Sequence, residues 1–157
     1  MKPRLNAYQA APAVMKAMMA LESQAAGIGL EPVLMELVKI RASQINGCAF
    51  CLHMHTRAAR AKGEKEERIY VLDAWRESPF YSARERAALA WTEAVTLVSQ
   101  THVPDDVHEQ ARAEFSEEEL VKLTLLVTTI NAWNRFAIGF RSIHPVNVKA
   151  GSTATAA

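Results

Sequence analysis

The sequence predicts a single all-α domain, because helix signals run along most of its length and strand signals are nearly absent. Apolar residues recur at helical spacing in several segments, and two serine-led capping boxes mark helix starts. No Asn-Gly pair is flanked on both sides by the alternating apolar residues typical of a β-hairpin. A chain of 157 residues can bury one substantial core. We therefore expect one domain over residues 1–149, with about seven helices.

The first two predicted helices begin at prolines, which are tolerated at the first position of a helix. One helix runs from Pro12 to Gly27. The next begins near Pro32 and keeps apolar residues at helical spacing as far as Asn46-Gly47. Asparagine and glycine both tolerate the left-handed conformation, so this pair favours a helix C-cap over a β-turn.

Three shorter helices complete the middle of the chain. The third predicted helix opens at Cys48 and closes near Gly63, and a fourth covers Glu66 to Trp75. Another is predicted over residues 104–114, where Pro104 occupies the first position.

The two longest apolar stretches of the C-terminal half each follow a capping box. Ser82–Glu85 precedes a helix predicted to reach about Ser99, and Ser116–Glu119 precedes one predicted to end at Phe140. We expect residues 150–157 to be disordered, because their glycine, serine, threonine and alanine side chains offer little to pack.

Composition and charge exclude several classes of function. Half of the residues are hydrophobic, 22% are charged, and the formal net charge is +1. The sequence therefore gives no indication of binding to nucleic acid or to an anionic membrane. No segment approaches the roughly 20 apolar residues of a membrane span, and Gln9, Pro12 and Lys16 interrupt the one stretch that resembles a signal peptide. We expect a cytoplasmic protein.

Both cysteines of the chain lie in one motif, Cys48-Ala49-Phe50-Cys51. Glu36 lies twelve residues before the first cysteine, and His55 lies four residues after the second. Because residues three and four apart share a helix face, Cys48, Cys51 and His55 should line one side of their helix. Two thiols, a base and an acid are what thiol redox chemistry needs: an attacking thiolate, a resolving thiol and a proton relay.

The predicted position of the motif favours ionisation of a thiol. Free backbone N–H groups and the helix dipole stabilise an anion in the first turn, and can lower a thiol pKa from about 8.5 to about 3.5–7.5. On the dipole alone, Cys48 would be the attacking thiol. His55 lies one turn from Cys51 and could take its proton, and Glu36 could orient His55 or exchange protons with the thiols.

Other interpretations of the motif are open at this point. A zinc site could recruit both cysteines, a histidine and Glu36, although structural zinc favours two paired knuckles and the chain has one. A thioredoxin-like domain would place the motif after a strand, whereas helix signals flank it here. Two inert buried cysteines are a further possibility, since free cysteine is often part of a core.

The spacing Glu36-x11-Cys48-x2-Cys51-x3-His55 resembles the signature of the alkylhydroperoxidase D-like (AhpD-like) branch of the carboxymuconolactone decarboxylase family. The resemblance extends from about Pro12 to Arg141 and includes Ser43–Cys48, His55-Thr56, Arg84–Trp91 and Asn131–Arg135. It implies an all-helical fold that associates into trimers or hexamers. The apolar surface of the first helix, which carries Val14, Met15, Met18, Met19 and Leu21, also favours a subunit interface.

The resemblance implies a peroxidase that reduces a hydroperoxide and is reduced in turn by a dithiol protein, lipoylated or thioredoxin-like. No bound cofactor or metal is expected. Cys51 is expected to attack the peroxide and Cys48 to resolve the sulfenic acid, with Glu36 and His55 as the proton relay. Phe50 stands where well-studied members have a second histidine, which bears on turnover rate and substrate range.

Two rival functions come from other classes. One is a lactone decarboxylase or related lyase of the same superfamily, whose chemistry needs no paired thiols. The other is a non-enzymatic, metal-binding or redox-sensing oligomer, in which the motif only reports oxidation. Zinc content and steady turnover with a reductant distinguish these from a peroxidase.

Overall fold

The computed structural model describes residues 2–145, and this part of the chain is all-helical, with no strand. The elements in chain order are α1 (Ala7–Ala10), α2 (Pro12–Ala26), α3 (Pro32–Asn46), α4 (Ala49–Ala61), α5 (Glu66–Tyr70), a 3₁₀ turn (Leu72–Ala74), α6 (Ala83–Thr96), α7 (Val98–Thr101), α8 (Asp105–Glu114) and α9 (Glu117–Phe140). The prediction of an all-α fold is confirmed. The predicted tail and the domain boundary at residue 149 lie outside the described residues.

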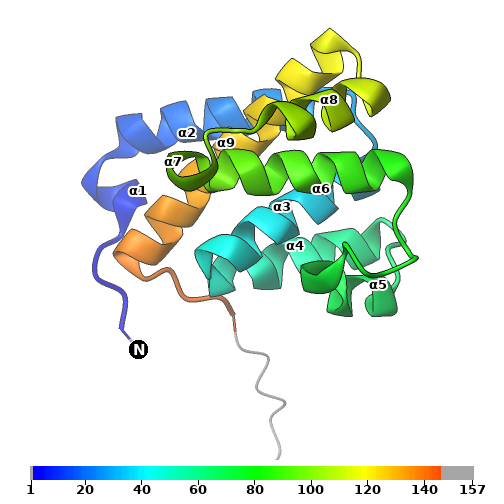
Figure 1. Ribbon diagram of the computed structural model, residues 1–157. Coiled ribbons are helices and arrows are strands. Elements are labelled where there is room, and N and C mark those ends of the chain that lie inside the picture. The colour runs from blue at the N-terminus through cyan, green and yellow to red at the C-terminus, as the bar shows by residue number, and fades with distance from the viewer. Residues whose placement is uncertain (1, 146–157) are drawn as a thin grey trace, which may run out of the picture.

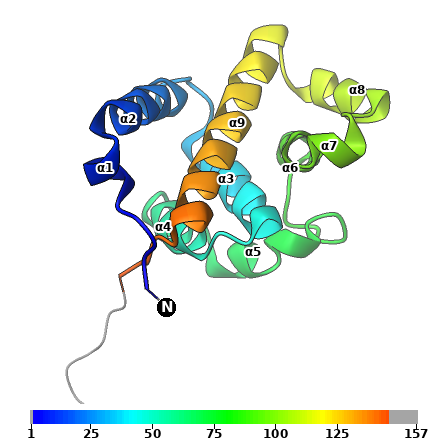
Figure 2. The ribbon, with the colours of Figure 1, turned by 90° about the vertical axis from the view of Figure 1, so that its left-hand side faces the viewer.

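Helix α3 lies at the centre of the fold and packs against α4, α6 and α9 (Figure 1). Helix α2 packs on α9, and α8 packs on α6, so these two helices form the outer flanks (Figure 2). The N-terminal segment lies beside the C-terminal end of α9, where the backbone N–H of Arg4 donates to the carbonyl of Phe140 at 2.9 Å. No helix of the described chain is long and apolar enough to cross a membrane.

The core consists mainly of aliphatic side chains from α3, α6 and α9. Leu37, Leu89 and Leu123 are fully buried, and Phe115 closes the core beside α8. Burying such side chains stabilises the fold by about 1.5–3 kcal/mol each. The apolar surface of α2 is only partly used, because Met15 is buried while Val14 and Met19 are each 50% exposed.

The predicted helix boundaries hold where local capping sets them. Both capping boxes form, with the side chains of Ser82 and Ser116 each accepting from the backbone N–H three residues on. Gly47 adopts the left-handed conformation, with φ of 69°, and ends α3 as predicted.

Several boundaries differ from the prediction, and one of them is the start of α8, where Pro104 is the N-cap and the helix begins at Asp105. The helix predicted over residues 82–99 ends at Thr96, where the Thr101 hydroxyl donates to the carbonyl of Ala94 and a separate short α7 follows. The helix predicted over residues 66–75 ends at Tyr70 and continues as a 3₁₀ turn that packs on α3. Cys48 is the N-cap of α4 and not its first residue, because its sulfur accepts from the backbone N–H of Cys51.

Candidate active site

The sharp turn at Gly47 places both thiols at the start of α4. Cys48 caps the helix, and its Sγ accepts a hydrogen bond of 3.4 Å from the backbone N–H of Cys51. Both cysteines are free and buried, with 1% and 2% of their surface exposed. They pack against Ile130 of α9, and Phe50 partly covers them. The first turn of α4 therefore holds two reduced thiols side by side in an apolar setting.

The two thiols differ in acidity because they interact with each other. The pKa of Cys48 is lowered to about 7, and the largest cause is the interaction with the Cys51 thiol. Burial raises this pKa, whereas the backbone N–H of Cys51 and the side chain of Asn134 lower it further. The same thiol–thiol hydrogen bond, burial and the charge on Cys48 raise the pKa of Cys51. At neutral pH the negative charge of the reduced pair therefore rests mainly on Cys48.

Glu36 and His55 form a buried pair next to the motif, as the sequence suggested. His55 Nδ1 lies 2.8 Å from Glu36 Oε2, and Lys62 Nζ lies 2.5 Å from Glu36 Oε1. Burial raises the pKa of Glu36, but the hydrogen bonds from His55 and Lys62 outweigh it and lower the pKa to about 2. Because an ionised carboxylate can only accept hydrogen bonds, Nδ1 of His55 is the donor in this pair.

The link from this pair to the thiols is less direct than expected. Within residues 2–145, no hydrogen bond joins His55 to the sulfur of Cys48 or Cys51. A role of Glu36 and His55 in moving the proton of a thiol therefore stays a prediction.

A polar network behind the thiols was not assigned to the site from the sequence. Asn46 Nδ2 donates to Asn134 Oδ1 at 2.8 Å and to Asn131 Oδ1 at 2.9 Å, and Asn134 Nδ2 donates to Ser43 Oγ at 3.1 Å. Asn134 is completely buried. The signal that could have revealed it is its position, since Asn134 falls on the apolar stripe of α9, where a polar side chain needs buried partners.

One cavity of about 320 Å³ reaches the motif. It lies between the start of α4 and the end of α9, and its wall includes Cys48 but not Cys51. The lining residues are Arg4, Gly47, Cys48, Ala49, Phe50, Ala137, Ile138, Arg141 and Ser142.

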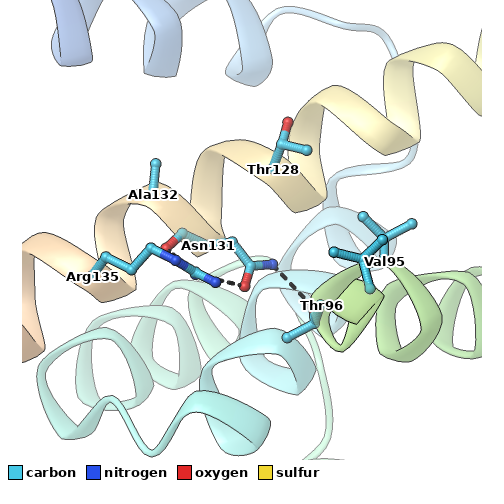
Figure 3. A pocket seen from close by; sticks show the side chains of 7 residues that line it. Val95, Thr96, Thr128, Asn131, Ala132 and Arg135 are labelled. Carbon is cyan, nitrogen blue, oxygen red and sulfur yellow. Dashed lines mark hydrogen bonds between the residues drawn. The ribbon is translucent and has the colours of Figure 1, made fainter. Parts of the chain in front are cut away.

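A second cavity of about 290 Å³ lies between α6 and α9 (Figure 3). There Asn131 Nδ2 donates to Thr96 Oγ1 at 3.0 Å, and Arg135 Nη1 donates to Asn131 Oδ1 at 3.0 Å. This cavity touches neither cysteine. The first cavity is therefore the better candidate for access to the thiols.

The side chains considered for zinc do not form a metal site. In the part of the chain that the structure describes, no group of three or more His, Cys, Asp or Glu side chains is arranged to hold a metal ion. The thiols interact with each other and with amide groups, and Glu36 interacts with His55 and Lys62.

Comparison with known proteins agrees with the geometry. Residues 12–94 match the model of the carboxymuconolactone decarboxylase family. The uncharacterized protein YdfG of Bacillus subtilis (strain 168) is 46% identical over 138 residues, which cover 88% of this chain and 94% of YdfG.

Solved structures show the same fold. One of them is ATU0492 from Agrobacterium tumefaciens, a protein of unknown function described as a candidate antioxidant defence protein AhpD. It superposes on this chain with a TM-score of 0.91 at 50% identity, and the match covers 92% of this chain and 99% of the ATU0492 chain. The debrominase Bmp8 superposes with a TM-score of 0.75 at 19% identity, over 86% of this chain and 73% of its own, and shares the fold alone. The chain therefore belongs to the carboxymuconolactone decarboxylase family, and its fold is the AhpD-like one.

Proposed function

We propose that this protein is a thiol peroxidase that reduces hydroperoxides through the Cys48–Cys51 pair. The observation that carries the proposal is the position of Cys48. Cys48 lines the cavity, and its pKa is lowered to about 7. A thiolate is the nucleophilic form of cysteine, and the backbone N–H of Cys51 donates to the Cys48 sulfur. The similarity to the candidate antioxidant protein from A. tumefaciens supports the same activity.

The proposed reaction has two covalent steps. In the first, the Cys48 thiolate attacks the distal oxygen of the hydroperoxide, so that an S–O bond forms as the O–O bond breaks. Cys48 becomes a sulfenic acid, and the alkoxide takes a proton to leave as the alcohol. In the second, the Cys51 thiolate attacks the Cys48 sulfur, and the hydroxide that leaves is protonated to water. The product is a Cys48–Cys51 disulfide.

The choice of Cys48 as the attacking thiol differs from the family-based expectation, which assigns attack to Cys51 and resolution to Cys48. That expectation stays a prediction. Two features of this chain support the reverse assignment. The cavity reaches Cys48, and the interaction with Cys48 together with burial raises the pKa of Cys51. The family assignment comes from the resemblance, and the position of His55, one turn from Cys51, supports it.

Glu36 and His55 fit the resolving step in this scheme. Glu36 accepts from Nδ1 of His55 and so fixes the tautomer in which Nε2 can accept a proton. Lys62 keeps Glu36 ionised at neutral pH. We propose that His55, on the Cys51 face of α4, takes the Cys51 proton when the disulfide forms.

An external dithiol must restore the pair by thiol–disulfide exchange. We propose a lipoylated or thioredoxin-like protein in this role. The direct test is peroxide consumption with excess dithiothreitol, measured for the wild type and for Cys48→Ser and Cys51→Ser. Sustained turnover by the wild type and loss of turnover in both variants would support the proposal. Turnover that survives either substitution would contradict it.

The attacking thiol can be identified separately with a sulfenic acid trap such as dimedone. After treatment with peroxide, Cys51→Ser should carry the trap on Cys48, because the resolving thiol is missing. Cys48→Ser should carry less label, since Cys51 does not line the cavity and its burial still raises the pKa of its thiol. The opposite labelling pattern would identify Cys51 as the attacking thiol.

A further inference from the structure

The cavity at Cys48 carries positive charge with no acidic residue among the described residues that line it. Arg4 enters from the N-terminal segment and Arg141 from the end of α9, two parts of the chain that the Arg4–Phe140 backbone hydrogen bond holds together. Within residues 2–145, no carboxylate forms an ion pair with either guanidinium. Such a pair of arginines is suited to a planar anionic group.

The backbone around both arginines is fixed. The Arg4 guanidinium donates through Nη1 to the carbonyl of Gly139 at 3.0 Å, which leaves its other N–H groups free for a ligand. Arg141 is the C-cap of α9, with φ of 56°, and its backbone N–H donates to the carbonyl of Ile138. The Arg4 side chain is therefore held by Gly139, and the backbone of Arg141 is fixed at the end of α9, where both residues line the cavity.

The rest of the wall is mainly apolar. Phe50, Ala137 and Ile138 contribute carbon surface. A volume of about 320 Å³ is at the lower end of the range for small-molecule sites, about 300–1,000 Å³. The cavity thus combines a cationic rim, an apolar wall and a reactive sulfur.

We propose that the hydroperoxide substrate is an organic molecule with a carboxylate, which Arg4 and Arg141 bind while the peroxide reaches Cys48. This inference rests on the proposed function and specifies its substrate class. The carbon body packs against Phe50 and Ile138. Binding a remote charged group in this way holds the O–O bond in line with the thiolate, which favours attack by proximity. The covalent steps are those given above, and the carboxylate takes no part in them.

A matched pair of substrates tests the proposal. Cumene hydroperoxide and its para-carboxylate differ only in the carboxylate group, and kcat/KM for each is measured with saturating dithiothreitol. We expect the wild type to favour the carboxylate by about tenfold, the effect of a charge-assisted hydrogen bond at a partly solvated site. Arg141→Gln should abolish this preference by lowering kcat/KM for the carboxylate, and added salt should weaken the preference in the wild type. Arg57→Gln, at an exposed arginine of α4 that lines neither cavity, is the matched control and should leave the preference unchanged.

A binding measurement completes the test without turnover. 4-Isopropylbenzoate should slow alkylation of Cys48 in the wild type and not in Arg141→Gln, and a neutral isopropylbenzene should protect neither protein. Equal kcat/KM for both substrates, or an equal loss with both in Arg141→Gln, would overturn the carboxylate site while leaving the peroxidase function intact. Absence of turnover with both substrates would refute the function itself. Absence of protection by the benzoate would refute the anion site.

Discussion

Replacing Cys51 by alanine should raise the pKa of Cys48, because the hydrogen bond from the Cys51 thiol is the largest cause of its low value. A thiol with a pKa of about 7 is half ionised at pH 7, whereas one with the ordinary pKa of about 8.5 is about 3% ionised. The thiolate population at pH 7 should therefore fall by about 15-fold. Burial of Cys48 opposes ionisation in both proteins, so the decrease can be larger still.

The assay follows the rate of iodoacetamide alkylation from about pH 5 to about pH 10, since the rate reports the thiolate. Cys48 is the one cysteine left in Cys51→Ala, so the profile belongs to a single group. Cys51→Ser provides the matched control, because its hydroxyl can still donate to the sulfur, and we expect an intermediate midpoint. Circular dichroism checks that the helices are retained.

A midpoint that stays near pH 7 in Cys51→Ala would refute this account of the acidity of Cys48. The helix N-terminus and Asn134 would then carry the effect. If the alkylation midpoint also rises above pH 8 in Cys51→Ser, the low pKa of Cys48 requires the Cys51 thiol, and a hydroxyl cannot replace it.

Three further predictions concern stability and assembly. Glu36 has a folded-state pKa of about 2, below its unfolded value, so its ion pairs stabilise the protein above about pH 4.5 and are lost as the pH falls towards 2. In urea unfolding, the free energy of unfolding of the wild type should exceed that of Glu36→Gln by up to about 3 kcal/mol above about pH 4.5, and this difference should shrink as the pH falls towards 2. A difference that does not change with pH would contradict this prediction. Asn134→Ala removes the buried hydrogen bonds that Asn134 makes with Asn46 and Ser43 and should cost about 2–4 kcal/mol, so a loss under about 0.5 kcal/mol would contradict the network. Light scattering at micromolar concentration should give a trimer or hexamer of the 17.4 kDa chain, because α2 exposes Val14 and Met19, and a monomer would contradict this expectation.

The sequence predicts the fold well where its signals are local. The capping boxes at Ser82 and Ser116 and the glycine at position 47 satisfy backbone groups within a few residues, so each helix end is encoded next to itself. The break between α6 and α7 was missed because the Thr101–Ala94 hydrogen bond that accompanies it is invisible to apolar periodicity. The short α1 was missed as well, although the Asn6 side chain caps it.

The same distinction holds for the site. Cys48, Cys51 and His55 are close in sequence, so helical spacing alone brings them to one side of the start of α4, and the pairing of Glu36 with His55 follows from packing α3 against α4. Lys62 reaches Glu36 from the other end of α4, and Arg4 and Arg141 meet from opposite ends of the chain. Such contacts depend on tertiary packing, which residue spacing does not encode.

The central claim is that one hydroperoxide molecule oxidises the Cys48–Cys51 pair to a disulfide. Its most direct test is an anaerobic titration of the fully reduced protein with a hydroperoxide, in which free thiols are counted and peptide masses are measured. We predict that one equivalent of peroxide consumes both thiols and yields an intramolecular disulfide, and that dithiothreitol restores both thiols. Peroxide that persists beside two intact thiols, or a single thiol lost without a disulfide, would contradict the account.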